Sequence, residues 1–418
     1  MTIRSTTLPS GLTVLSDEMP TVESASVGVW VCAGTRDETP EQNGIAHLLE
    51  HMAFKGTARR SPRAIAEEIE AVGGQINAYT SREQTAYYAR VLADDVPLAV
   101  DMLGDILLHS TLDAGELARE REVVVQEIGQ AQDTPDDIVF DHFQAAAYPD
   151  QAMGRPVLGT AETVRAMDRD AVGAYLARHY RGKRMILGAA GRVEHDALVA
   201  LAAEAFEGLA PGEAGNAEPA CYAGGESRDP RKLEQLHLVL GFPGLAYDDE
   251  DYYALSVFST LYGGGMSSRL FQEVREERGL AYSIYSFHSS YTDTGMFGVY
   301  AGTSPADVEE LLDVIAKESG ALAETVSEEE IARARAQIKA GVLMALESSW
   351  ARCERLANHL MSFGRIVPID EMVARIEAVD GASVERIARR IFAGRPTVSA
   401  VGPVETLESY DRIARRFG

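Results

Sequence analysis

Two histidines and a glutamate with metal-binding potential lie within five residues, in the segment His47-Leu48-Leu49-Glu50-His51. On an α-helix, residues i and i+4 share one face about 6 Å apart, so both imidazoles could reach one ion. Glu50 comes directly before His51 and would project beside the same site. A histidine pair at this spacing also occurs in helices that bind nothing, so the segment indicates a metal site only if a further ligand exists.

A second helical pattern, residues 114–128, supplies a candidate third ligand. At about 100° per residue, Glu127 lies between Val123 and Val124, so it is expected to point from the apolar face of this helix. A carboxylate in that position is costly unless it is paired or bound to metal. Zinc in hydrolases usually takes three protein ligands and leaves one position for water. The two histidines and Glu127 are therefore the predicted ligands of one Zn²⁺ per chain.

The order H-x-x-E-H is the inverse of the zinc-peptidase motif H-E-x-x-H. Seventy-five residues separate His51 from Glu127. In these features the chain resembles the family of pitrilysin, insulin-degrading enzyme and the mitochondrial processing peptidases. The segments 54–57, FKGT, and 73–83, GGQINAYTSRE, are similar to those of the processing-peptidase β subunit and its bacterial relatives. The resemblance spans nearly the whole chain and implies a zinc metalloendopeptidase.

The resemblance also implies roles for individual residues. Glu50 would be the general base that takes a proton from a water at the zinc ion. Glu120 matches the family's second glutamate, seven residues before the ligand, and would orient a histidine ring or support the ligand helix. Arg275 and Tyr282 match an arginine and a tyrosine, seven residues apart in the second half, that reach the substrate. A guanidinium and a phenol are donors that can hold a peptide carbonyl and its oxyanion.

A short alternating run, Gln75–Thr80, reads as a strand. In the resembled family the corresponding edge strand pairs with an extended peptide, and such pairing through the backbone suits broad specificity. The resemblance therefore implies that peptides or unfolded segments are bound in an enclosed chamber, and it assigns substrate binding to four residues of this run: Asn77, Ala78, Tyr79 and Thr80.

The elements that must position these residues repeat along the chain. Residues 25–31 read as a strand and 41–56 as a helix, and 236–242 as a strand with a helix from 252 onward. We expect an α+β protein of two homologous halves, each a mainly antiparallel sheet covered by helices. The expected division is an N-terminal catalytic domain at 1–212, a Gly- and Pro-rich linker at 213–231, and a C-terminal domain at 232–418 without a zinc site, which contributes the Arg/Tyr pair.

Length and composition limit the alternatives. The chain has 418 residues, which favours two domains, and a net charge of -25, which argues against nucleic acid as a ligand. Neither a signal peptide nor a membrane-spanning stretch is recognisable, so a cytoplasmic, bacterial-type protein is expected. Because the chain carries both the metal motif and the Arg/Tyr pair, a homodimer is the economical expectation, with a heterodimer with a homologous chain as the other possibility.

Two other functions remain open. One is a zinc hydrolase of a different bond. The other is a non-catalytic relative that acts as a scaffold or partner, like the core subunits of respiratory complex III or the processing-peptidase α subunit. Such relatives typically lose parts of H-x-x-E-H, whereas this sequence keeps all of it. The complete motif therefore favours catalysis.

Overall fold

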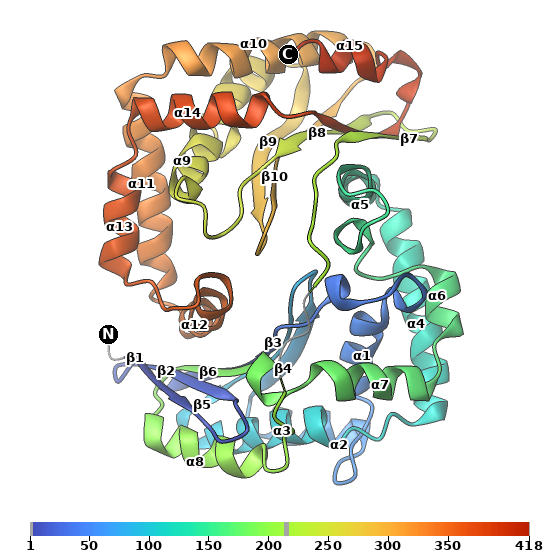
Figure 1. Cartoon of the computed structure of the whole chain (residues 1–418), viewed down its shortest axis with the longest axis vertical. Coiled ribbons are helices and arrows are strands. Elements are labelled where there is room, and N and C mark those ends of the chain that lie inside the picture. The colour runs from blue at the N-terminus through green and yellow to red at the C-terminus, as the bar shows by residue number, and fades with distance from the viewer. Residues whose placement is uncertain (1–2, 213–216, 418) are drawn as a thin grey trace. The chain divides into compact units, whose positions relative to one another are not determined.

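A computed structural model describes residues 3–212 and 217–417, and the chain divides into two compact units (Figure 1). The first unit comprises Met1–Gly129, Arg155–Glu218 and Met344–Ile366. The second unit comprises Gln130–Gly154, Pro219–Leu343 and Val367–Gly418. Each unit thus takes one segment from the other half of the sequence, which departs from the continuous division at 213–231 that the sequence predicts.

The first unit is built on a six-stranded sheet with the order β1-β2-β6-β3-β5-β4. Neighbouring strands are antiparallel except β2 and β6, which are parallel. Alternate residues of the central strand serve opposite faces: Val27 and Val29 enter the main core, and Trp30 enters a smaller cluster on the other side. The strands are β1 (Ile3–Thr7), β2 (Thr13–Glu18), β3 (Ser24–Val31), β4 (Gln75–Thr80), β5 (Thr85–Leu92) and β6 (Met185–Gly191).

Helices cover both faces of this sheet. Those that carry or surround the metal motif pack on the main-core face, whereas α12 packs on the opposite face against β3 and β6. The rings of Trp350 in α12 and Trp30 in β3 stack at 5.9 Å between centroids. The helices are α1 (Ile45–Ala53), α2 (Pro62–Ala71), α3 (Val96–Leu108), α4 (Ala114–Gln132), α6 (Ala161–Ala166), α7 (Arg169–His179), α8 (His195–Ala205) and α12 (Ser349–Phe363).

The second unit is built on a five-stranded sheet with the order β7-β11-β8-β10-β9, in which only β7 and β11 are parallel. Helix α5 packs on one face, against β8 and β11, and the other helices build the larger core with α9, α10 and α14. The strands are β7 (Gly225–Pro230), β8 (Leu236–Pro243), β9 (Ala281–Ser290), β10 (Gly295–Thr303) and β11 (Thr397–Gly402). The helices are α5 (Pro135–Ala147), α9 (Tyr252–Gly263), α10 (Val308–Thr325), α11 (Glu328–Ala345), α13 (Ile369–Glu377), α14 (Gly381–Phe392), α15 (Tyr410–Ala414) and a π-helix (Phe271–Glu276).

The two sheets repeat one topology. The series β2-β6-β3-β5-β4 and β7-β11-β8-β10-β9 each begin with a parallel pair and continue antiparallel. A helix follows the middle strand in both, α1 after β3 and α9 after β8. The prediction of an α+β fold with two homologous halves is therefore confirmed.

Local differences from the sequence predictions have simple causes. The helix expected at 41–56 is shorter, because Gly44 takes a left-handed φ of 95° and α1 begins only after it. The linker expected at 213–231 contains β7, whose parallel pairing with the distant β11 leaves no local sequence signal; residues 213–216 of that linker lie outside the described residues. Helix α9 ends at Gly263, the first of three successive glycines.

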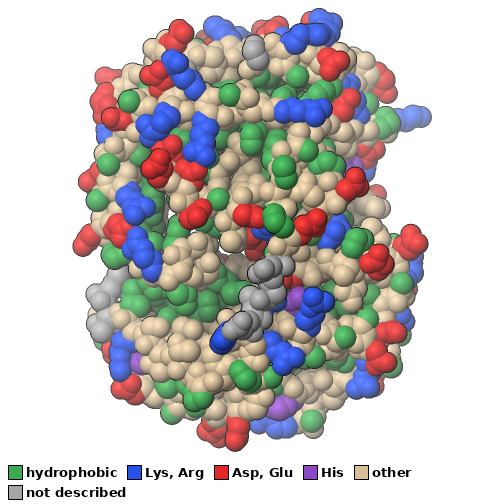
Figure 2. Space-filling view, viewed as in Figure 1, with side chains coloured by type: hydrophobic (Ala, Val, Ile, Leu, Met, Phe, Trp, Pro, Cys, Tyr) green, Lys and Arg blue, Asp and Glu red, His purple; other side chains and the backbone are tan. Residues whose placement is uncertain are grey.

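Surface and helix composition give two further observations. On the face shown in Figure 2, acidic and basic side chains are intermixed in both units, so the charge of -25 forms no single-signed patch there. Among the described helices, none combines the length and apolar character required to cross a bilayer.

Candidate metal centre

The first unit brings together the three predicted metal ligands. Atoms of His47, His51 and Glu127 that can bind a metal lie within 4.8 Å of one another, the one such group among the described residues. The Nε2 atoms of both histidines are 3.6 Å from Oε2 of Glu127. Ligand atoms at about 2.0–2.1 Å from a tetrahedral zinc ion stand about 3.3–3.4 Å apart. The spacing and the two-nitrogen, one-carboxylate donor set therefore fit zinc.

Helix α1 holds the two histidines by packing its other side into the core. Leu48 and Leu49 are fully buried, while His47 and His51 lie one turn apart with ring centroids at 4.7 Å. Burial and the neighbouring His51 lower the pKa of His47 to about 4. A histidine must be neutral to bind metal, so this shift keeps the ring of His47 ready as a ligand at neutral pH.

The start of α1 is capped by a residue that the sequence analysis missed. Gly44 has no side chain to accept hydrogen bonds from the first turn, and Glu38 takes that role. Its carboxylate accepts from the backbone of Gly44 and of Ala46, each at 2.9 Å, and from the side chain of Asn43 at 3.0 Å. Burial raises the pKa of Glu38 to about 7 against these hydrogen bonds. An acidic residue shortly before a helix that begins at glycine is the signal that could have found it.

Glu120 lies behind His51. Its Oε2 is 3.1 Å from Nδ1 of His51, and its Oε1 is 2.8 Å from Nζ of Lys55. A proton on Nδ1 donated to this carboxylate leaves Nε2 of His51 as the free nitrogen that faces Glu127. Sequence reasoning did not single out Lys55, which follows His51 by four residues and lies just beyond the end of α1.

Glu50 lies on α1 between the two ligands and hydrogen-bonds to the sheet. Thr80 Oγ1 in β4 donates to Oε2 of Glu50 at 2.6 Å. Burial raises the pKa of Glu50, whereas the Thr80 hydrogen bond and the nearby His51 lower it. The carboxylate is therefore partly withdrawn from water and is a better base than an exposed glutamate.

The predicted orientation of Glu127 is wrong. Its side chain is 43% exposed, whereas that of Glu120 is 7% exposed. The apolar stripe of α4 is formed by Leu117, Val124 and Ile128, and Val123 lies outside it with 44% exposure. The wheel position between Val123 and Val124 thus lies at the edge of the buried stripe, where a ligand remains accessible to water.

The other predicted site residues fall into two places. In the second unit, the guanidinium of Arg275 lies 4.7 Å from the ring centre of Tyr282, which is 75% exposed. In the first unit, Asn77, Ala78, Tyr79 and Thr80 belong to β4, the last strand of its sheet. The structure therefore pairs Arg275 with Tyr282, and it brings Thr80 to the metal motif.

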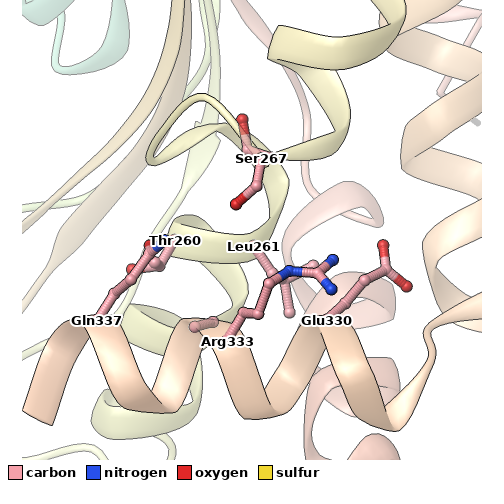
Figure 3. Close-up of a pocket in the computed structure, with 8 residues that line it drawn as sticks. Thr260, Leu261, Ser267, Glu330, Arg333 and Gln337 are labelled. Atoms are coloured by element: carbon pink, nitrogen blue, oxygen red, sulfur yellow. The ribbon is translucent and has the colours of Figure 1, made fainter.

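A pocket in the second unit contains none of the predicted site residues. It lies between α9 and α11 and is lined by Thr260, Leu261, Ser267, Ser268, Glu330, Arg333, Ala334 and Gln337 (Figure 3). In the close-up, Gln337 of α11 extends toward Thr260 of α9, and the guanidinium of Arg333 points toward Glu330. The metal centre is therefore identified by its donor atoms in the first unit, and this pocket in the second unit is not part of it.

Comparison with known proteins supports this interpretation of the first unit. Residues 13–161 match the family model for insulinase, peptidase family M16, and residues 166–338 match the model for the peptidase M16 inactive domain. An uncharacterized zinc protease of Streptomyces coelicolor is 42% identical over 99% of this chain and 93% of its own length. The mitochondrial-processing peptidase subunit beta of Bos taurus is 39% identical over 98% of this chain and 86% of its own.

Solved structures share the fold at lower identity. A chain of complex III from Candida albicans superposes with a TM-score of 0.90 at 24% identity, covering 100% of both chains. A protease from Helicobacter pylori superposes with a TM-score of 0.89 at 22% identity, over 96% of this chain and 99% of that one. The relatives named zinc proteases support a peptidase-like function and zinc as the metal. On the extent and identity of these matches, the chain belongs to the insulinase family, peptidase family M16.

Proposed function

We propose that this protein is a zinc-dependent endopeptidase that cleaves peptides or unfolded segments held as an extended strand. The observation that carries the proposal is the convergence of His47, His51 and Glu127 on one point, with Glu50 on the same helix as the two histidines. The relatives named zinc proteases support the same function.

The metal would be held by Nε2 of His47, Nε2 of His51 and a carboxylate oxygen of Glu127. Zinc held there supplies polarisation of the scissile carbonyl and lowers the pKa of a water toward about 7. Glu50 takes the proton of the attacking water and returns it to the leaving amine nitrogen. Its partial burial favours this role, because burial raises the pKa of Glu50.

Supporting residues orient these groups. Glu120 accepts a hydrogen bond from the Nδ1–H of His51 and so keeps Nε2 directed at the metal position. Lys55 offsets the buried charge of Glu120. Arg275 and Tyr282 are proposed to donate hydrogen bonds to the substrate carbonyl oxygen as negative charge develops on it.

The substrate is proposed to pair with β4. This strand has a neighbour, β5, on one side only among the described strands, so its other edge can accept an added strand. Pairing through Asn77, Ala78, Tyr79 and Thr80 would fix the peptide by its backbone and leave side-chain preference broad.

A partner chain and a cytoplasmic location belong to the proposal. Relatives in Arabidopsis thaliana and Bos taurus are named subunits of mitochondrial-processing peptidases. We therefore infer that the protein works as a dimer, with a second copy of itself or with a homologous chain. Its mass in solution, alone and mixed with a homologue from the same cell, distinguishes the two.

The second candidate function is a non-catalytic scaffold or partner subunit. The structural likeness to a chain of complex III from Candida albicans favours it, because the same fold occurs there as part of a larger complex. A scaffold has no need for a complete donor set with a buried supporting glutamate, and this chain retains both. Catalysis is therefore the better-supported proposal.

Substitution with metal analysis tests the proposal. Glu50→Gln is expected to keep about one zinc per chain and to lose peptide cleavage, whereas His47→Ala loses both. Glu127→Gln should also lose zinc, and Glu122→Gln, an exposed glutamate on the same helix that pairs with Arg165, serves as its matched control. If the purified parent binds no zinc and a chelator leaves cleavage unchanged, the metallopeptidase proposal is wrong.

A further inference from the structure

Strand β4 presents alternate side chains to opposite faces of its sheet. Ile76 and Ala78 pack against the core that contains α1, whereas Tyr79 packs in the cluster on the other face. Thr80 continues the alternation of Ile76 and Ala78, and its hydroxyl accordingly meets Glu50 of α1 at 2.6 Å. The contact between Thr80 and Glu50 thus follows from the register of the strand.

The free edge of β4 lies at the same residues. The backbone N–H of Ala78 donates to the side-chain oxygen of Asn77 at 2.8 Å rather than to the neighbouring strand. That amide therefore faces the unpaired edge, where an extended peptide would form its hydrogen bonds. Because the direction of the backbone N–H repeats every two residues along a strand, we expect the N–H of Thr80 to point the same way, while its side chain holds Glu50.

We propose that Thr80 is a positioning residue for the general base: its hydroxyl fixes the direction of the Glu50 carboxylate and couples it to the strand on which the peptide lies. The role rests on the proposed peptidase function and deepens it. It also changes the expectation for Thr80, whose side chain serves the catalytic helix while its backbone serves the substrate.

The physical reason is the freedom of the glutamate side chain. Glu50 has three rotatable side-chain bonds, and among the described residues Thr80 is the group that hydrogen-bonds to its carboxylate. A hydrogen bond to Oε2 leaves Oε1 as the oxygen available to take a proton. A catalytic group must be held within about 0.5 Å of its working position, and neighbouring hydrogen bonds provide that restraint.

Two substitutions at Thr80 and one control isolate this restraint. Thr80→Val removes the hydroxyl and keeps the shape, and Thr80→Ser keeps the hydroxyl. Thr85 is the cross-strand partner of Thr80, and its hydroxyl donates to the carbonyl of Ala33 rather than to Glu50. Thr85→Val therefore measures how much activity is lost when any buried hydroxyl is removed from the paired strands β4 and β5.

The kinetic expectation is a loss in kcat. General-base catalysis is worth about 10²–10⁴-fold, so a misdirected base should lower kcat about 10–100-fold with KM little changed. Thr80→Ser should restore kcat to within about threefold of the parent, and zinc content should remain at the parent level in every variant. In a Glu50→Gln background, Thr80→Val should have no further effect, because the base it orients is already absent.

A readout that does not need turnover accompanies the kinetics. The side-chain carboxyl ¹³C signal of Glu50, assigned by its absence in Glu50→Gln, should shift in Thr80→Val and return in Thr80→Ser, in the protein without added metal. An unmoved signal together with an unchanged kcat overturns the positioning role. An equal kcat loss in Thr85→Val, or an undiminished effect of Thr80→Val in the Glu50→Gln background, also overturns the positioning role, because either result shows a general disturbance of the strand.

If the parent cleaves nothing, the proposed function fails by itself, and the ¹³C signal still decides whether Thr80 positions Glu50.

Discussion

The two units share a sheet topology and differ in what the helix after the middle strand carries. In the first unit that helix, α1, presents His47, Glu50 and His51. In the second, α9 follows β8. Aligning residues 251–259 with residues 43–51, which likewise follow a strand and a polar turn, places Leu255, Phe258 and Ser259 at the corresponding positions, and all three are buried. Helix α1 thus has polar groups at the metal position, and α9 has a closed core there.

The contact between this helix and the edge strand shows the same contrast. In the first unit the contact is charged: Thr80 of β4 donates to Glu50. In the second it is neutral and buried: Ser259 and Ser286 of β9 lie 3.2 Å apart, and Phe258 packs in an aromatic cluster beside them. The comparison indicates that the fold needs only a helix seated on the sheet, and that a few side chains at one surface of that helix decide whether it can bind metal.

The largest effect is expected when the first unit is made to resemble the second. His47→Leu replaces a ligand by the residue type found at Leu255. Zinc should be lost and cleavage should fall by at least about a thousandfold, because the donor set is incomplete. Thermal stability of the metal-free protein should stay the same or rise, since a buried neutral imidazole is replaced by an apolar side chain. Metal analysis checks the expected loss of zinc, and the unfolding temperature of the same sample checks the expected stability. Retained zinc would contradict the assignment of His47 as a ligand.

The reverse change should cost stability and create no site. Leu255→His places an imidazole at a fully buried position without a carboxylate partner. We expect a loss of about 2–5 kcal/mol in the free energy of unfolding, from the lost apolar packing and the unsatisfied ring nitrogens. Urea unfolding measures it, with Leu255→Met as the control that keeps the volume. If Leu255→His bound a second equivalent of zinc, the difference in metal binding between the two units would be smaller than the comparison of α1 and α9 indicates.

The sequence predicted what local periodicity encodes. The strand Gln75–Thr80 and the helix at 114–128 were found from their spacing, and the two histidines share a helical face for the same reason. The exchange of residues 130–154 and 344–366 between the units was not predictable, because it depends on packing such as that of Trp350 on Trp30 across the sequence. The exposure of Glu127 was mispredicted because a helical wheel locates the apolar stripe but not its edge.

A smaller effect is expected from the lysine behind the site, which has no counterpart in the neutral contact of the second unit. Lys55→Met leaves the buried carboxylate of Glu120 without its cation. The orientation of His51 should weaken, and zinc affinity should fall about tenfold, as for other residues that support metal ligands. Competition with a chelator measures the affinity. Lys55→Arg should retain most of it, and equal affinity in the parent and Lys55→Met would show that Glu120 needs no counter-charge.

The smallest expected effect is a change in the pH dependence of stability. Burial raises the pKa of Glu38 from 4.5 to about 7, so between these values the folded protein holds a proton that the unfolded chain has released. The contribution of Glu38 is therefore present below pH about 4.5 and is lost as the pH rises to about 7. His47 acts in the opposite direction, because its pKa is lowered from 6.5 to about 4 and its contribution to stability grows as the pH rises through that window.

Urea unfolding of the metal-free protein at intervals from pH 4.5 to 8 separates the two effects. Glu38→Gln should remove the part of the stability that falls with rising pH, and His47→Leu should remove the part that rises. Because Asn43 and the first turn of α1 donate to Glu38, the Gln variant should also be less stable at every pH by about 1–3 kcal/mol. A constant loss with an unchanged slope would mean that Glu38 caps α1 without holding a proton, and that the metal-bearing helix responds to pH through His47 rather than through its cap.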